Sequence, residues 1–195
     1  MQQIELELAG GGVLTVSLRA SLDAMPAVKQ RPLVLVVPGG GYNHVSPREG
    51  DPVALQFAAA GYHTAVLTYS VGEGAQNYRP LRQLNEALAL LRQNAGEWHI
   101  LPDKIAVCGF SAGGHLALSA AVLDIPGETA QQRPNAVILG YPVITAGEFA
   151  HRGSFVQLAG SEDAAAQQVF TLEDKVTSDT PPVFVWHTKI GRAHV

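Results

Sequence analysis

The chain has 195 residues, of which 47% are hydrophobic, 15% are charged and 20 are glycines. This composition is typical of one folded domain with a sizeable core and excludes a disordered chain. The net charge is −4 and the basic residues form no cluster, so we expect no nucleic-acid partner.

The N-terminus and the apolar runs predict neither export nor a membrane span. MQQIELELAGG lacks a charged start followed by an apolar stretch, and no apolar run approaches membrane-spanning length. We therefore expect a cytoplasmic protein with no membrane partner, with an export signal missing from an incomplete N-terminus as the alternative. Whether the chain forms a homo-oligomer is left open.

The first part of the chain predicts an antiparallel hairpin and then a buried strand. Residues 4–8 and 13–18 alternate apolar and polar side chains around three glycines, which is typical of a half-buried hairpin. Residues 33–37 are apolar throughout, as in a strand buried on both faces. Asp51 resembles an N-cap followed by proline at the first helical position, which predicts a helix over residues 53–60.

The rest of the chain alternates strands and helices. We expect strands at residues 64–69, 105–108, 136–139 and 183–186, and helices at residues 81–92 and from Gly114 onward. Residues 143–180 are polar and rich in loops, with one helix expected near residues 163–170, and are predicted to form a lid-like excursion. The sequence therefore predicts an α/β fold with a mainly parallel sheet, helices on both faces and an N-terminal antiparallel hairpin.

The segment from Lys104 to Leu118 contains the motif Gly-x-Ser-x-Gly, centred on Ser111. A chance match is expected in roughly one such chain in ten, but here a predicted strand precedes the motif and a helix follows it. Such a turn lifts the serine hydroxyl out of the sheet and places it at a helix N-terminus, where developing negative charge is favoured. Ser111 is therefore the candidate nucleophile.

A second glycine-rich turn, residues 39–41, follows another strand at the same edge of the predicted sheet. It lacks the Gly-Lys-Ser/Thr of a P-loop and does not enter a helix as a dinucleotide fingerprint does. A flexible turn without function is the plainer alternative. Because this turn is expected to lie beside the Ser111 turn, we interpret it as part of an oxyanion hole, with the N–H groups of Gly40, Gly41 and Ala112 as donors. The two turns together predict acyl transfer through serine.

The chain resembles the α/β-hydrolase superfamily, and within it the esterase and lipase group of carbohydrate acetyl esterases and feruloyl-esterase-like proteins. The matching segments span nearly the whole chain: PGGGY (38–42), SPREGDPVA (46–54), GY (61–62), LTYSV (67–71), EWHI (97–100), DKIAVCGFSAGGHLA (103–117), GYPV (140–143), HRGSF (151–155) and PPVFVWHT (181–188). The resemblance implies a serine hydrolase of carboxylic esters, acting without a cofactor on an acetyl ester of a carbohydrate or small alcohol. An amidase or peptidase of the same superfamily is one alternative, and a catalytically incompetent fragment is another.

The C-terminus departs from this family pattern. The resemblance implies a catalytic acid and then a histidine after the WHT segment, but Thr188 is followed only by KIGRAHV. His194 is disfavoured as the base because no acid lies between it and the strand. We expect the acid, the base, the last strand and a helix to be missing, so that residues 1–188 form an incomplete and inactive hydrolase domain. KIGRAHV is the translation of AAG ATC GGA AGA GCA CAC GTC, which resembles a sequencing-library adapter, so residues 189–195 are expected to be a non-native tail.

Other side chains receive smaller roles. We expect Tyr42, His44 and His187 to line the substrate pocket, and Cys108 to be a buried thiol rather than a reactive one. His115 is expected to pack or hydrogen-bond within its helix, with catalysis as the minor alternative. Three acids are expected at the surface or at helix caps: Asp163, Asp174 and Asp179. His151 and Arg152 are expected to form an internal hydrogen bond, with contact to the substrate as the alternative. No cluster has metal-ligand spacing, so no metal is expected.

Overall fold

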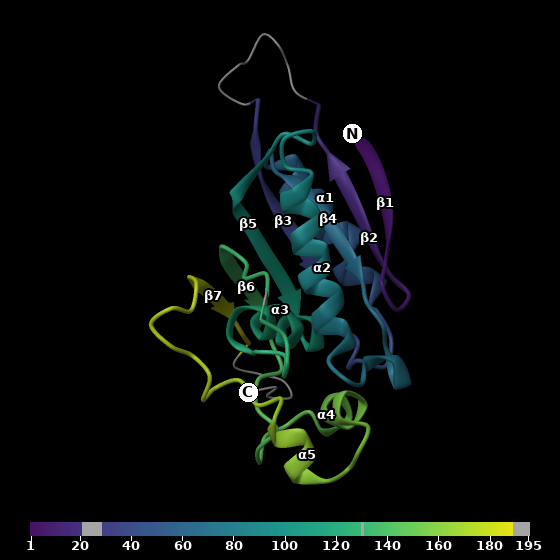
Figure 1. The fold of residues 1–195 in the computed structure, drawn as a ribbon, viewed down its shortest axis with the longest axis vertical. Helices are drawn as coiled ribbons and strands as arrows, with labels where there is room; N and C mark the ends of the chain where they lie inside the picture. Colours follow the sequence, from purple (N-terminus) through teal and green to yellow (C-terminus); the bar gives the residue numbers. More distant parts are fainter. Residues whose placement is uncertain (21–28, 130, 189–195) are drawn as a thin grey trace.

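The computed structural model describes residues 1–20, 29–129 and 131–188 and has an α/β architecture (Figure 1). The strands are β1 (Gln2–Leu8), β2 (Gly12–Leu18), β3 (Arg31–Val37), β4 (His63–Thr68), β5 (Ile100–Phe110), β6 (Ala136–Gly140) and β7 (Val183–Trp186). The helices are α1 (Asp51–Ala59), α2 (Arg79–Gln93), α3 (Ala112–Val122), α4 (Arg152–Ala159) and α5 (Ala164–Gln168), with short 3-10 turns η2 (Pro47–Glu49) and η3 (Gly72–Ala75).

One sheet joins the seven strands of the described residues in the order β1-β2-β4-β3-β5-β6-β7. The β1–β2 hairpin and the β2–β4 pair are antiparallel, whereas β3, β4, β5, β6 and β7 run parallel to one another. The predicted hairpin and the mainly parallel sheet are therefore confirmed. Figure 1 shows that α4 and α5, which lie between β6 and β7 in sequence, sit beyond the carboxyl ends of β3 and β5.

Both faces of the sheet are covered by helices, as the apolar strands predict. Leu33, Leu35 and Val37 of β3 pack into the large core cluster with α2 and α3. The alternate residues Val34 and Val36 pack into a smaller cluster with α1 on the other face. Since neighbouring side chains of a strand point to opposite faces, a strand buried on both sides must be apolar throughout.

Two local predictions need correction. Asp51 is the first residue of α1 rather than its N-cap: Gly50 is the N-cap, and its carbonyl accepts from the N–H groups of Val53 and Ala54. The excursion contains α4 in addition to the expected helix near residue 163. The sequence does not predict α4 because this helix buries only a short face centred on Phe155. β7 forms at residues 183–186 as predicted, and its four residues are 39 to 63% exposed at the edge of the described sheet.

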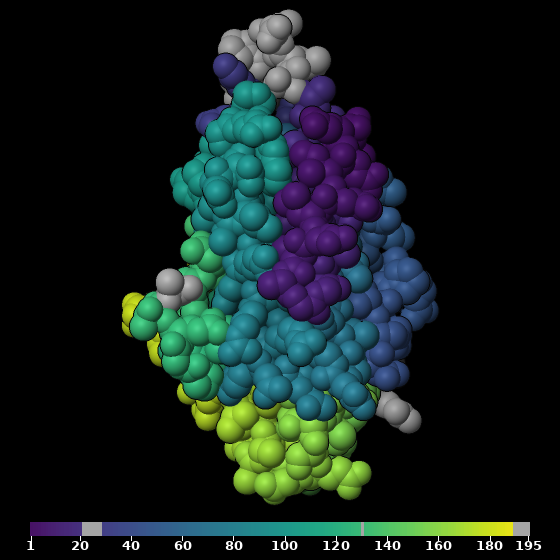
Figure 2. All heavy atoms as spheres, turned by 45° about the vertical axis from the view of Figure 1, so that its right-hand side comes forward, coloured from purple at the N-terminus to yellow at the C-terminus, as the bar shows by residue number. Residues whose placement is uncertain are grey.

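The hairpin and the helices α4 and α5 occupy separate parts of the surface. Figure 2 shows the β1–β2 hairpin lying beside α2 on one face, with the green and yellow segment of α4 and α5 gathered at one end. None of the helices in the described part of the chain is long and apolar enough to cross a membrane. The expected tail, residues 189–195, lies outside the described residues.

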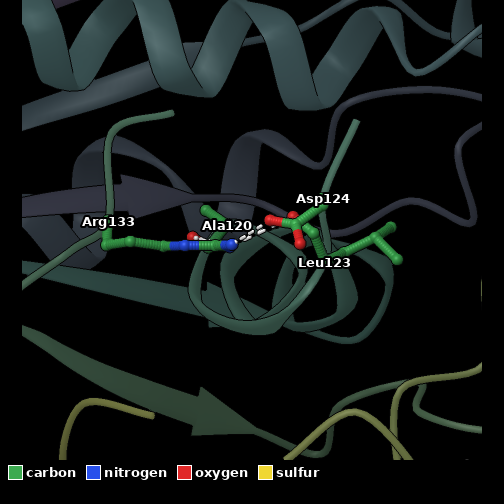
Figure 3. A network of polar contacts seen from close by, with 4 residues as sticks. All are labelled: Ala120, Leu123, Asp124 and Arg133. Carbon is green, nitrogen blue, oxygen red and sulfur yellow. Dashed lines mark hydrogen bonds and ion pairs between the residues drawn. The ribbon is translucent and has the colours of Figure 1, made fainter. Parts of the chain in front are cut away.

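Arg133 closes the C-terminal end of α3, the helix that begins after Ser111 (Figure 3). Its guanidinium donates to the carbonyls of Ala120 (3.1 Å) and Leu123 (3.0 Å) and pairs with the carboxylate of Asp124. The last carbonyls of a helix have no partner within the helix, so a side-chain donor of this kind stabilises the helix end.

Arg133→Ala is expected to lower the free energy of unfolding by about 1–2 kcal/mol, because the two carbonyls lose their partner. In thermal unfolding this corresponds to a fall in Tm of about 2–8 °C for a chain of this size. Asp124→Ala is the matched control and should change Tm much less, since the Asp124 side chain is 82% exposed and exposed ion pairs contribute little. Equal losses in the two variants would contradict the carbonyl-capping role.

Candidate active site

Ser111 occupies a sharp turn between β5 and α3. Its backbone has φ +52° and ψ −120°, a conformation that L residues rarely adopt. The Ser111 N–H donates to the Gly140 carbonyl (3.0 Å), and the Ser111 carbonyl accepts from the Val143 N–H (3.1 Å). The turn that follows β6 therefore holds the strained residue in place.

The glycines on either side of Ser111 are required by a close approach of strand and helix. A Cβ atom at Gly109 would lie 2.2 Å from the Gly113 carbonyl oxygen, and one at Gly113 would lie 2.2 Å from the Val37 carbonyl oxygen. Both distances are far below van der Waals contact, so neither position admits a side chain without movement of the backbone. The sequence-based expectation for this turn is confirmed.

The second glycine turn lies next to Ser111. A Cβ atom at Gly39 would lie 3.0 Å from the Ser111 Cβ, and one at Gly40 would lie 2.0 Å from the His44 carbonyl oxygen. Gly40 and Gly41 both have positive φ, +127° and +66°. Within the described residues, the N–H groups of Gly40, Gly41 and Ala112 donate no hydrogen bond, which leaves three backbone donors at the two turns.

A cavity of about 450 Å³ opens at these turns, and most of its lining residues have polar side chains. It brings together the predicted Ser111, Gly40, Gly41 and His44. The full lining consists of Gly40, Gly41, Asn43, His44, Ser46, Arg48, Glu49, Ser111, Tyr141, His151, Gly153 and Gln157. The predicted Tyr42, Ala112 and His187 are not among these residues.

Tyr42 is buried and contacts His115. The Tyr42 hydroxyl donates to Nδ1 of His115 (2.8 Å), and Nε2 of His115 donates to the Phe170 carbonyl (2.8 Å). Both side chains are 1% exposed. Because Tyr42 follows the glycine turn, His115 belongs to α3 and Phe170 follows α5, this network joins three segments around Ser111.

His115 is neutral in the folded protein at neutral pH. Burial lowers the pKa of His115 to about 4, although its bond to the Phe170 carbonyl acts in the opposite direction. With both ring nitrogens engaged in structural bonds, His115 is not available as the base for Ser111. Its expected packing role is thus supported.

The lowered pKa of His115 predicts how stability depends on pH. Above about pH 6.5 the imidazole is neutral in both states, whereas between about pH 6.5 and 4 only the unfolded chain binds the proton. The free energy of unfolding should therefore fall as the pH falls through this range, by up to about 1.4 kcal/mol per pH unit from this group.

His115→Gln is the matched variant, since glutamine can both donate and accept a hydrogen bond but does not titrate. Urea unfolding at pH 7 and pH 4.5 should show a smaller acid loss for His115→Gln than for the wild type. Burial also lowers the pKa of His63, which acts in the same direction but is present in both proteins. An equal acid loss in the two proteins would contradict the assignment.

Three of the minor candidates have clear surroundings in the structure: His151, Asp163 and Cys108. His151 bonds to the Ser154 hydroxyl (2.9 Å), which is the internal hydrogen bond expected for it, and it also lines the cavity; contact with substrate stays a prediction. Asp163 caps α5 by accepting from the Ala165 N–H, as expected. Cys108 is buried, and burial raises the pKa of its thiol to about 12, which disfavours a reactive thiolate.

Glu49 is one of the cavity residues that the sequence did not single out. It lies within the matching segment SPREGDPVA, yet a single carboxylate in a loop has no periodic pattern that marks a role.

No group of three or more His, Cys, Asp or Glu side chains in the described part of the chain could hold a metal ion.

Comparison with known proteins gives consistent matches. Residues 23–145 match the BD-FAE family. The chain is 35% identical over 176 residues to an endo-1,4-beta-xylanase B of Butyrivibrio fibrisolvens, covering 82% of this chain and 27% of that protein. It is 31% identical over 158 residues to an acetylxylan esterase of Xylanibacter ruminicola, covering 78% of this chain and 32% of that protein.

A solved structure extends the match to the fold. The crystal structure of MGS-M1, an α/β hydrolase from a deep-sea metagenome library of the Medee basin, is 37% identical, with a TM-score of 0.74. The match covers 94% of this chain and 67% of MGS-M1. The chain therefore spans about a quarter to a third of the two curated relatives and two thirds of this structural relative.

Proposed function

Because the chain belongs to the BD-FAE family of esterase-like α/β hydrolases, we propose that it is a serine hydrolase of carboxylic esters. The observation that carries the proposal is the meeting of Ser111 with the Gly40–Gly41 turn at one cavity. The Ser111 hydroxyl attacks the ester carbonyl, and the acyl group is transferred to Ser111 while the alcohol leaves. Water then releases the acid. No cofactor takes part in this scheme.

The three backbone N–H groups of Gly40, Gly41 and Ala112 are proposed to hold the oxyanion. Each is without a hydrogen-bond partner in the described residues, and each belongs to a backbone fixed by neighbouring contacts. Donors fixed in advance stabilise developing charge because they need no reorganisation, and one such donor is typically worth about 3 kcal/mol.

The general base is proposed to lie outside residues 1–188, together with the acid that orients it. In support, His115 is fully engaged by Tyr42 and Phe170, and His44 belongs to the oxyanion turn rather than to a loop after a later strand. The chain spans 67% of the structural relative, which leaves room for such residues in a longer protein. The present chain is therefore proposed to be weakly active unless an external base is supplied.

An acetyl ester of a carbohydrate is the proposed substrate class. The cavity is lined by several polar side chains able to bond to hydroxyl groups, among them Asn43, His44 and Gln157. One of the curated relatives is an acetylxylan esterase, which supports the same class. A cytoplasmic location remains a prediction.

The substrate proposal is tested with p-nitrophenyl esters of acetate, butyrate and octanoate, the amide p-nitroacetanilide, and acetylated xylo-oligosaccharides. All reactions contain imidazole as an external base, with Ser111→Ala as the blank. We expect Ser111-dependent release to be fastest with acetate and with the acetylated sugar. Preference for octanoate would contradict the acetyl assignment, and preference for the amide would favour an amidase.

A further inference from the structure

Glu49 lies between the two loops that flank Ser111. It ends the 3-10 turn η2, eight residues after the Gly40–Gly41 turn, and its half-buried side chain lines the cavity. Nothing in the proposed acyl transfer uses this carboxylate. A negative charge near the site of a developing oxyanion is unfavourable by itself, so its presence calls for another reason.

The two carboxylate oxygens of Glu49 accept hydrogen bonds from different loops. Oε2 accepts from the Gly39 N–H (2.7 Å), and Oε1 accepts from the Tyr141 hydroxyl (2.8 Å). Gly39 begins the glycine turn, whereas Tyr141 follows Gly140, whose carbonyl binds the Ser111 N–H. Glu49 therefore connects the turn that carries the oxyanion donors to the turn that holds the nucleophile.

The glycine turn needs such a connection because glycine has more backbone freedom than any other residue. Gly40 and Gly41 have φ +127° and +66°, which the chain must maintain without side-chain packing of their own. The Gly39 carbonyl accepts from the Ser46 N–H (2.9 Å), and the Gly39 N–H is held by Glu49. Both polar groups of the Gly39 backbone are thus fixed.

The Glu49 carboxylate and the Tyr141 hydroxyl are chemically suited to connect the two turns. A carboxylate accepts two hydrogen bonds at once, and bonds to a charged acceptor are stronger than neutral ones. Burial, followed by the bond to Glu49, raises the pKa of Tyr141 to about 12, so its hydroxyl stays protonated and remains a donor at neutral pH.

We propose that Glu49 is a positioning residue that holds Gly39 and thereby aims the Gly40 and Gly41 N–H groups at the oxyanion. The inference rests on the proposed function, since it assigns Glu49 a role in the geometry of the oxyanion hole. Glu49 acts through the Gly39 backbone and through Tyr141 and does not exchange protons with the substrate.

The test measures how fast a fluorophosphonate probe phosphonylates Ser111 in the full chain, with imidazole as external base. Rates at several probe concentrations separate the bond-forming rate constant, kinact, from the binding constant, KI. Glu49→Ala should lower kinact by about 10- to 100-fold, because small displacements of preorganised donors have effects of this size. KI should stay within about threefold, since Glu49 is only one of the residues that line the cavity and the others are unchanged.

Glu49→Gln is the conservative variant. Its amide oxygen can accept from the Gly39 N–H while its amide nitrogen donates to the Tyr141 oxygen, so kinact should stay within about threefold of the wild type. Tyr141→Phe removes one of the two bonds and should lower kinact by about three- to tenfold. Asp51→Asn, two residues along the chain, controls for loss of one negative charge and should leave kinact unchanged.

The outcomes separate the two proposals. Wild-type kinact in both Glu49→Ala and Tyr141→Phe would overturn the role of Glu49 and leave the proposed function intact. Absence of any Ser111 adduct in the wild type would overturn both. If Glu49→Ala does not fold, as judged by circular dichroism, Tyr141→Phe decides: a fall in kinact at unchanged KI supports the role, and an unchanged kinact overturns it.

Discussion

Gly113→Ala is expected to destabilise the protein by about 3 kcal/mol or more, since overpacking against rigid groups is among the most costly kinds of substitution. The added Cβ would lie 2.2 Å from the Val37 carbonyl oxygen and 2.4 Å from the Pro38 carbonyl oxygen. Both are backbone atoms at the end of β3, so they cannot rotate away as a side chain would. Relief requires α3 to move away from β3, which also separates Ser111 from the glycine turn.

Gly96→Ala is the matched control for this substitution. Gly96 is exposed, and a Cβ atom there would meet nothing within 4 Å. Reduced freedom of the unfolded chain should make this variant neutral or more stable by up to about 1 kcal/mol. Urea unfolding of both variants measures the difference, and a Gly113→Ala protein as stable as Gly96→Ala would contradict the close approach of α3 to β3.

Ser111→Ala is expected to remove all hydrolysis of p-nitrophenyl acetate above the rate of imidazole alone. In complete serine hydrolases the loss of the nucleophile lowers kcat by about 10⁶-fold. The folded structure should persist, because alanine retains the Cβ atom and adds no contact at φ +52°. Ser161→Ala, at a serine outside the cavity lining, should keep the full rate. Equal rates for Ser111→Ala and the wild type would remove Ser111 from the reaction.

The elements that position the site could be predicted because their signals are local. β3 and β5 are apolar runs ending at glycine turns, and the spacing of Gly109, Ser111 and Gly113 reports a strand-to-helix contact that admits no side chain. The residues around Ser111 that depend on distant partners could not be predicted. The sequence places Tyr42 in the pocket lining, but its hydroxyl bonds to His115, which is 73 residues away in the sequence.

Glu49 and α4 were missed for related reasons. The contacts of Glu49 are with Gly39 and with Tyr141, 92 residues away, so no local pattern marks its role. α4 has only eight residues, and its buried side chains are Ser154, Phe155 and Leu158, which is too short an apolar face to stand out from a polar loop.

The most direct test of the account is to locate the adduct formed by a fluorophosphonate probe, using intact mass and peptide mapping, with and without imidazole. We predict one adduct per chain, on the peptide that contains Ser111, formed slowly alone and several-fold faster with imidazole, and absent from Ser111→Ala. Rapid labelling of Ser111 without imidazole would contradict the missing base while leaving the nucleophile in place. An adduct on another residue, or none under either condition, would contradict the assignment of Ser111 as the nucleophile.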